Sequence, residues 1–192
     1  MKKLIIIGSP GAGKSTLATK LGSILGIPVV HLDSFFWKPG WLRTTKNERL
    51  AILEEITVYH NHWILDGNYE NVIDYQLGIT EGVILFNFPR YVCYWRVIKR
   101  RLSYIGKAHP EIAPGCPDKI DWDLLRTIWS YPSAEGKIIR EKILNNQREL
   151  HVIELRSTKE AERFIADIEK RCQLPTSWQS NTAITGLPDS TG

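Results

Sequence analysis

One stretch near the start of the chain limits its possible folds more than any other. Residues 8–16 match G-x-x-x-x-G-K-[ST], the pattern of a phosphate-binding loop. An apolar run covers residues 2–7, and residues 15–25 carry apolar side chains at helical spacing. Strand, glycine-rich loop and helix in this order are the context that the motif requires, so an ordinary glycine turn is disfavoured. We expect the following residues to bind a nucleotide: Gly8, Ser9, Pro10, Gly11, Ala12, Gly13, Lys14, Ser15 and Thr16.

The residue types in this loop match the chemistry of phosphate binding. Glycines let successive backbone N–H groups point at one anion, and the helix that follows adds its positive N-terminal end. Lys14 is expected to bridge the β- and γ-phosphates, and Ser15 to offer its hydroxyl to Mg²⁺. The cofactors predicted from the loop are therefore ATP and Mg²⁺.

The rest of the chain alternates between short apolar runs and segments of helical pattern. The apolar runs cover residues 2–7, 27–33, 62–67, 82–88 and 150–155. Alternation of this kind predicts an α/β protein with a parallel sheet covered on both faces. We therefore expect a three-layer P-loop NTPase fold with a five-stranded parallel sheet and a small lid.

The predicted domain spans residues 1–172. Residues 104–121 form a long stretch rich in Gly and Pro, which we interpret as the lid. Residues 173–192 are rich in Ser, Thr, Pro and Gly and have few apolar side chains, so we expect a mobile tail.

The composition of the chain indicates its cellular location and its partners. The net charge of the 192-residue chain is +4, and its basic residues are widely spread, which disfavours nucleic acid without excluding it. Cys93, Cys116 and Cys172 are far apart, which favours a reducing cytoplasm. No apolar segment reaches transmembrane length, so no membrane partner is expected. A small-molecule acceptor is the expected partner, and the chain is expected to be a monomer or a homodimer.

Several further stretches resemble a known family. Residues 63–67 are an apolar strand that ends in Asp-Gly, residues 96–101 carry an arginine pattern, and residues 152–170 are a final strand and helix. On these stretches the chain resembles the adenylate kinase-like P-loop kinases over about residues 1–171. Within that group, residues 31–33, 37–41 and 66–69 resemble the DNA topology modulation (FlaR-related) family.

The resemblance implies roles for residues outside the phosphate loop. Asp66 would orient magnesium or its water shell, while Arg96 and Arg100 would face the phosphates. Arg126 would be a later arginine of the lid, which would close over the nucleotide and exclude water. The alternative for these arginines is a solvated basic helix face.

The acceptor site departs from the adenylate kinase pattern. In that family an arginine shortly after Asp-Gly binds the acceptor monophosphate, but here the residues are Asn68, Tyr69 and Glu70. Asp33, at a predicted strand end, is expected to bind an acceptor hydroxyl or to act as its base, unless it only caps the next turn. Trp37 either helps to wall the acceptor pocket or packs on the core.

These features together predict an enzyme. We expect a cytoplasmic ATP-dependent small-molecule kinase whose acceptor is not AMP, with Asp33, Trp37, Asn68 and Tyr69 in contact with that acceptor. The expected catalytic residues are Lys14, Asp33, Arg96, Arg100 and Arg126. The alternative function is that of a nucleotide-dependent regulatory or DNA-associated protein.

Overall fold

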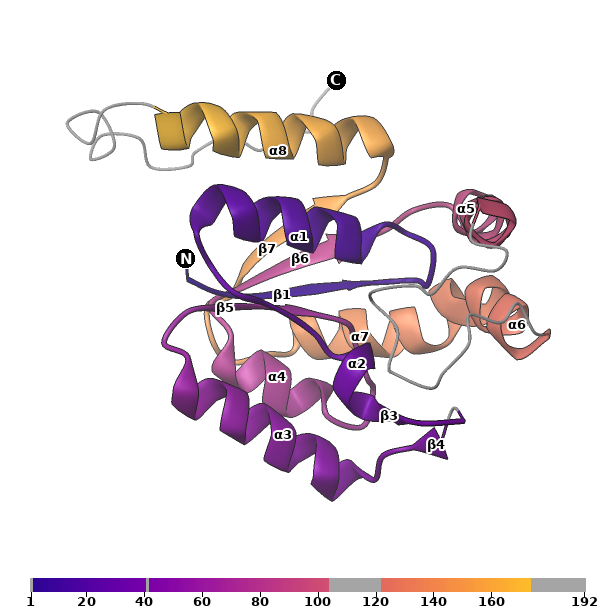
Figure 1. The fold of residues 1–192 in the computed structure, drawn as a ribbon, viewed down its shortest axis with the longest axis horizontal. Helices are drawn as coiled ribbons and strands as arrows, with labels where there is room; N and C mark the ends of the chain where they lie inside the picture. Colours follow the sequence, from indigo (N-terminus) through magenta and orange to yellow (C-terminus); the bar gives the residue numbers. More distant parts are fainter. Residues whose placement is uncertain (1, 41, 104–121, 174–192) are drawn as a thin grey trace.

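A computed structural model describes residues 2–40, 42–103 and 122–173. Five parallel strands form one sheet in the order β2-β5-β1-β6-β7 (Figure 1). Strand β1 lies at the centre, where Ile5 is opposite Leu65 on one side and Val83 on the other. The strands are β1 (Lys3–Gly8), β2 (Val29–His31), β5 (Trp63–Asp66), β6 (Gly82–Phe86) and β7 (His151–Leu155). The predicted five-stranded parallel sheet is confirmed.

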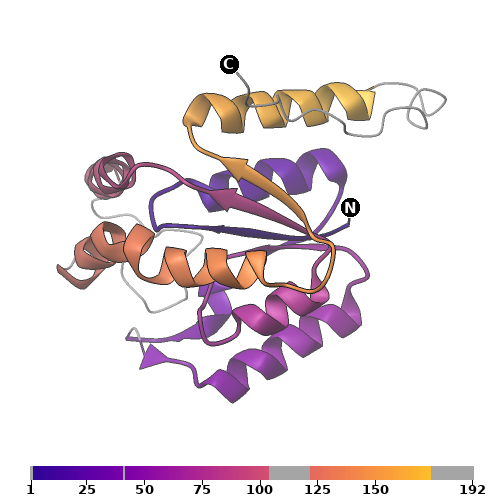
Figure 2. The same cartoon turned by 180° about the vertical axis from the view of Figure 1, so that it is seen from behind.

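Helices cover both faces of the sheet (Figures 1 and 2). One layer consists of α1 (Lys14–Leu25) and α8 (Thr158–Gln173). The opposite layer consists of α3 (Lys46–Tyr59), α4 (Ile73–Ile79) and α7 (Glu135–Leu144). Side chains of β1 alternate between the layers, because Leu4 and Ile6 pack with Leu21 while Ile5 and Ile7 pack with Leu77. This is the three-layer arrangement that the sequence predicts.

The remaining elements lie near the carboxyl ends of the strands, where the phosphate loop also lies (Figure 1). Helix α5 (Arg90–Ser103) packs on α6 (Trp122–Ser130), and a short 3₁₀ turn, η1 (Tyr131–Ser133), leads into α7. The predicted lid at residues 104–121 lies outside the described residues, as does the tail from residue 174. Gln173, which the sequence assigns to that tail, is the last residue of α8.

The aromatic segment after β2 is more regular than its sequence suggests. It forms the four-residue helix α2 (Asp33–Phe36) and a hairpin of β3 (Trp37–Lys38) with β4 (Leu42–Arg43). Phe36 is fully buried with Leu53 of α3, which anchors the segment on the core. Burial of this ring stabilises the segment, together with hydrogen bonds to the Phe36 carbonyl from the Thr44 N–H at 3.2 Å and the Thr44 Oγ1 at 2.8 Å.

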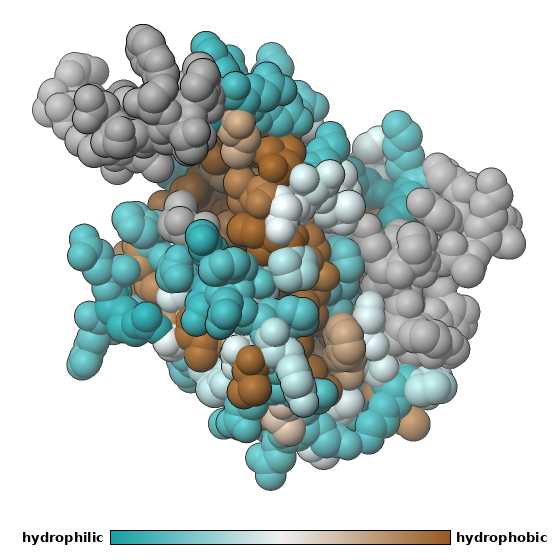
Figure 3. Space-filling view, turned by 60° about the vertical axis from the view of Figure 1, so that its left-hand side comes forward, coloured by the Kyte–Doolittle hydropathy of each residue, from teal (hydrophilic) through white to brown (hydrophobic). Residues whose placement is uncertain are grey.

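One face of the molecule is mixed in polarity. Figure 3 shows one face on which hydrophobic side chains form a central band between hydrophilic ones. None of the helices in the described part of the chain is long and apolar enough to cross a membrane.

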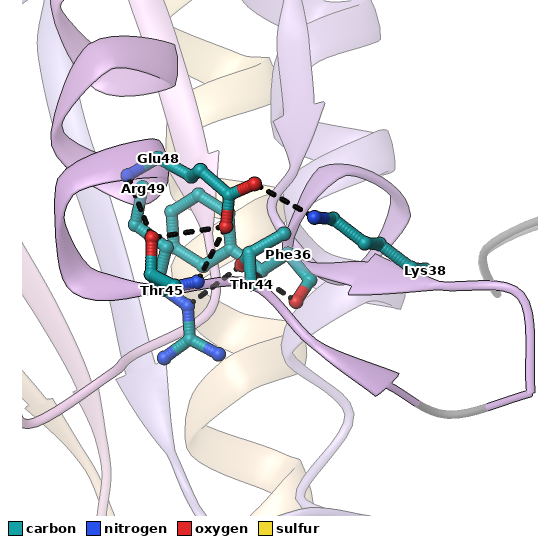
Figure 4. Close-up of polar contacts among 6 residues, drawn as sticks. All are labelled: Phe36, Lys38, Thr44, Thr45, Glu48 and Arg49. Carbon is teal, nitrogen blue, oxygen red and sulfur yellow. Dashed lines mark hydrogen bonds and ion pairs between the residues drawn. The ribbon is translucent and has the colours of Figure 1, made fainter.

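Helix α3 begins at the capping box that the sequence predicts (Figure 4). The Glu48 N–H donates to Thr45 Oγ1 at 3.3 Å, and the Thr45 N–H donates to Glu48 Oε2 at 2.7 Å. Lys38 of the hairpin forms an ion pair with Glu48 at 2.7 Å. The start of α3 is therefore tied to the hairpin beside the candidate site.

These contacts predict a pH dependence of stability. The Lys38 ion pair, with help from the Thr45 hydrogen bonds, lowers the pKa of Glu48 from 4.5 to about 2. A carboxyl group with a lowered pKa in the folded state stabilises the fold above its unfolded pKa, and this contribution is lost as the pH falls from 4.5 towards 2. Glu48→Gln should therefore flatten the loss of melting temperature over this range, by a small amount because the pair is exposed. Glu55→Gln, an exposed change on the same helix, is the control and should leave the pH profile unchanged.

Candidate functional site

The phosphate loop is held closely against α5. Gly11 has φ +78° and Gly13 has φ +98°, conformations that side chains disfavour. A Cβ at Gly11 would lie 2.5 Å from the carbonyl oxygen of Cys93 and 2.7 Å from Val97 Cγ2. Glycine at position 11 is therefore required both by the backbone conformation and by the contact with α5.

Lys14 lies at the mouth of this loop. Its Nζ donates to the Gly8 carbonyl at 2.9 Å and to the Ser9 carbonyl at 3.1 Å. Helix α1 begins at Lys14, and its N-cap is Gly13, which has no side chain to satisfy the first N–H groups. Half-buried Ser15 and exposed Thr16 belong to the same first turn. A positive helix end with uncapped donors and a lysine suits a polyphosphate.

Arg96 connects the loop to two other elements. Its Nη1 donates to the Ala12 carbonyl at 2.7 Å, and its Nη2 donates to Thr158 Oγ1 at the start of α8 at 2.8 Å. Its guanidinium carbon lies 5.2 Å from the centre of the Phe88 ring. Arg100 lies one turn further along α5 and is half-buried, whereas Arg126 is exposed on α6. Of the three predicted arginines, Arg96 is the one whose described hydrogen bonds reach the phosphate loop.

Asp66 is the last residue of β5 and is only 5% exposed. Its Oδ2 lies 2.7 Å from His31 Nδ1, a partner that the sequence reasoning missed. Its Oδ1 is buried and has no hydrogen-bond partner among the residues that the structure describes. An orphaned carboxylate oxygen is costly to bury, and it fits a hydrated cation.

No group of three or more His, Cys, Asp or Glu side chains in the described ranges could enclose a metal ion. Magnesium beside a nucleotide needs no such cage, because phosphate oxygens and water supply most of its ligands. Ser15 and Asp66 are therefore the residues predicted to contribute to a magnesium site, and the absence of a larger cluster among the described residues does not conflict with that prediction.

A second group of polar side chains lies around Asp33, the first residue of α2. The Tyr69 hydroxyl donates to Asp33 Oδ1, and Trp37 Nε1 donates to the Tyr69 hydroxyl at 3.2 Å. Asp33 is exposed at the surface, yet desolvation by the protein atoms packed around its carboxyl raises the pKa of Asp33, against the opposing effects of the Tyr69 hydrogen bond and the Lys14 charge. Burial, followed by the negative charge of Asp33, also raises the pKa of Tyr69. The structure thus brings together three of the four predicted acceptor residues.

Asn68, the fourth predicted acceptor residue, makes a different set of contacts. Its Oδ1 accepts from the Gly8 N–H at 3.0 Å, and its Nδ2 donates to Glu135 Oε1 at 3.0 Å. Asn68 therefore joins the phosphate loop to the first residue of α7. Burial raises the pKa of Glu135, although the Asn68 hydrogen bond and the nearby charge of Lys14 oppose this shift. The sequence did not single out Glu135 as a site residue, because Glu135 belongs to no recognisable motif.

Arg49 of α3 is a further residue that the sequence reasoning missed. It is only 5% exposed, and its guanidinium carbon lies 4.7 Å from the centre of the Tyr69 ring and 5.2 Å from that of Phe36. Its position four residues before buried Leu53 places it on the apolar face of the helix, a signal that could have revealed it.

No protein-family model matches the chain. An adenylate kinase of Phytoplasma australiense is 27% identical over an alignment 182 positions long, and the alignment covers 79% of this chain and 84% of the relative. An adenylate kinase of a Cyanothece species is 26% identical over 117 residues, which cover 58% of this chain and 57% of the relative.

A solved structure shares the fold. Shikimate kinase from Acinetobacter baumannii, in complex with shikimate, superposes with a TM-score of 0.56 at 14% identity, covering 88% of this chain and 91% of that one. The fold is that of the P-loop kinases. The relatives and this P-loop kinase fold together support a nucleotide-binding kinase, whereas the resemblance to the DNA topology modulation family stays a prediction.

Proposed function

We propose that this chain transfers the γ-phosphate of Mg-ATP to a hydroxyl group of a small acceptor other than AMP. The observation that carries the proposal is the position of Asp33, which begins α2 just beyond β2, at the same edge of the sheet as the phosphate loop. A carboxylate near the phosphate loop, but not part of it, suits an acceptor hydroxyl. The cytoplasmic location and the monomeric or dimeric state remain predictions from sequence.

The phosphate loop would bind the nucleotide. Its N–H groups and Lys14 would hold the phosphates, while Arg96 fixes the loop through the Ala12 carbonyl. Ser15 and Asp66 would hold magnesium, which neutralises charge on the phosphates when bound. Phosphoryl transfer depends mainly on such positioning and charge neutralisation.

Asp33 would act on the acceptor. Its Oδ1 accepts from Tyr69, and its Oδ2 accepts no hydrogen bond from the described residues, which leaves it available for an acceptor O–H. As the acceptor oxygen bonds to the γ-phosphorus, the bond from that phosphorus to the departing ADP oxygen breaks. The acceptor proton passes to Asp33 and then to solvent. The raised pKa of Asp33 improves its match to a proton acceptor at neutral pH.

The segment after Gly67 argues against AMP. A phosphate dianion is normally bound by arginines in forked contact, but here Asn68, Tyr69 and exposed Glu70 follow Gly67. The amide of Asn68 is engaged with Gly8 and Glu135, and the Tyr69 hydroxyl is engaged with Asp33. The charge of Glu70 would repel an anion.

Steady-state ATP consumption with a panel of nucleosides, nucleotides and small metabolites tests this proposal. We expect at least one hydroxyl-bearing compound to stimulate turnover and Asp33→Asn to lower that rate by about 10²- to 10⁴-fold, the usual contribution of a general base. Asp74→Asn, an exposed change on α4, is the matched control. Phosphorylation of AMP with kcat/KM of about 10⁴ M⁻¹s⁻¹ or more, unchanged in Asp33→Asn, would contradict the proposal.

A further inference from the structure

The side chain of Asn68 continues the hydrogen-bond ladder between β5 and β1 beyond the end of β5. The last backbone bond of that ladder runs from the Gly67 N–H to the Ile6 carbonyl, at 3.3 Å. A parallel ladder would next join the Gly8 N–H to the Gly67 carbonyl, but this carbonyl accepts from Gln76 Nε2 at 3.4 Å. The Gly8 N–H donates to Asn68 Oδ1 at 3.0 Å instead. An amide side chain therefore replaces a backbone acceptor at the first residue of the phosphate loop.

Glu135 determines which end of the Asn68 amide faces the loop. Asn68 Nδ2 donates to Glu135 Oε1 at 3.0 Å. A backbone N–H can only donate and a carboxylate can only accept, so a side chain between Gly8 and Glu135 needs an acceptor at one end and a donor at the other. An amide meets both needs in one orientation, and the flipped amide would set donor against donor and acceptor against acceptor.

Glu135 is itself held in place by the fold. It is the first residue of α7, and a Cβ at the next residue, Gly136, would lie 2.7 Å from the Tyr131 carbonyl oxygen and 2.9 Å from Tyr131 Cε1. Tyr131 is only 6% exposed, so this close contact fixes the start of α7 against a buried ring. Asn68 and Glu135 are both half-buried, which strengthens the hydrogen bond between them relative to one in water.

The residue that Asn68 holds also supports Lys14. The Gly8 carbonyl accepts from Lys14 Nζ at 2.9 Å. On its other side Gly8 lies against β6, because a Cβ at Gly8 would lie 2.6 Å from Phe86 Cβ. A phosphate loop binds through successive N–H groups that point at one anion, so the placement of its first residue affects the direction of those that follow.

Building on the nucleotide binding that the proposed function assigns to this loop, we propose that Asn68 and Glu135 are positioning residues for the nucleotide. Glu135 orients the Asn68 amide, and the amide holds Gly8 so that the loop is set for the phosphates. Neither side chain has to touch the nucleotide in this role.

An exchange of the two polar groups tests the inference without requiring turnover. Calorimetry measures binding of a non-hydrolysable ATP analogue with Mg²⁺ to the full chain. Asn68→Asp sets a carboxylate against Glu135 and should weaken binding by about tenfold or more. Glu135→Gln keeps an oxygen that accepts from Asn68, so this variant should bind at least as tightly as the wild type. Combining the two changes should restore most of the affinity, because an aspartate at position 68 can accept from both the Gly8 N–H and the glutamine amide.

Glu141→Gln provides the matched control for the exchange. Glu141 is an exposed acid of the same helix, so its substitution removes the same charge without touching Asn68. Combined with Asn68→Asp, it should restore no affinity. If Asn68→Asp does not melt cooperatively without ligand, Asn68→Ala and Glu135→Ala replace the exchange. Their losses of affinity should then be strongly non-additive, as expected for two residues that act through one contact.

Each result supports or overturns the inference. Unchanged affinity in Asn68→Asp would overturn it, as would equal recovery with Glu135→Gln and with Glu141→Gln, or additive losses in the alanine pair. A large loss in Glu135→Gln alone would show that the carboxylate itself meets the nucleotide or its metal, which also contradicts a positioning role. A wild type that does not bind the analogue would contradict both this inference and the proposed function. The expected pattern of binding without phosphoryl transfer would support the roles of Asn68 and Glu135 and count against the proposed phosphotransfer alone.

Discussion

Replacing Lys14 with alanine is expected to remove most of the thermal stabilisation that Mg-ATP gives to the protein. A ligand that binds only the folded state stabilises it by about 2.7 kcal/mol at a concentration one hundred times its Kd. For a domain of this size that corresponds to a rise of roughly 5–10 °C in melting temperature. Lys14 spans the mouth of the loop through the Gly8 and Ser9 carbonyls, so its ammonium group is positioned for the phosphates.

Lys20→Ala provides the matched control for this experiment. Lys20 is an exposed lysine of the same helix, so its loss removes the same charge at a distance from the loop. The control should show the wild-type shift with Mg-ATP. A wild-type melting temperature that saturating Mg-ATP does not move would contradict the assignment of the loop.

Replacing Asp66 with asparagine is expected to abolish most turnover while the fold is retained. The change keeps the shape of the side chain and the possibility of a hydrogen bond to His31, but it removes the charge that suits a metal or its water shell. Loss of one group that stabilises transition-state charge typically costs about 10²- to 10³-fold in kcat. The rate is measured with the best acceptor of the panel over a range of magnesium concentrations.

Two measurements serve as controls for the turnover of Asp66→Asn. The melting temperature of Asp66→Asn without ligand reports the fold, and Asp74→Asn, at an exposed acid of α4, should keep wild-type turnover. Near-normal magnesium-dependent turnover in Asp66→Asn would assign the metal role to another residue.

Short sequence patterns were sufficient to predict the phosphate loop, the five strands of the sheet and the start of α3. The phosphate loop was recognisable because its function requires glycine, lysine and a hydroxyl residue at fixed spacing, and the five strands because each is a short apolar run. The capping box at Thr45 predicted the start of α3, since both of its hydrogen bonds join residues three apart. Patterns within single segments therefore predicted the strands of the sheet and the start of α3.

The contacts that shape the acceptor side depend on distant partners. Asp66 contacts His31 across neighbouring strands, and Asn68 donates a hydrogen bond to Glu135, which is 67 residues away in the sequence. The packing of α3 places Arg49 against the ring of Tyr69. The short helix α2 and the β3–β4 hairpin are held by the burial of Phe36 and by the hydrogen bonds that Thr44 donates to its carbonyl. None of these pairings has a fixed spacing, so the sequence alone could name Asp33, Trp37 and Tyr69 as neighbours but could not supply the surrounding charges.

The central claim is phosphoryl transfer from ATP to a small acceptor, and tracing the γ-phosphate tests it most directly. The protein is incubated with Mg²⁺, ATP whose γ-phosphoryl oxygens carry ¹⁸O, and the metabolite panel, and products are read by mass spectrometry. We expect one hydroxyl-bearing compound to gain a phosphoryl group with the heavy label in the wild type but not in Lys14→Ala. Labelled phosphate that appears only as free inorganic phosphate, or no consumption of ATP with any compound, would contradict the account.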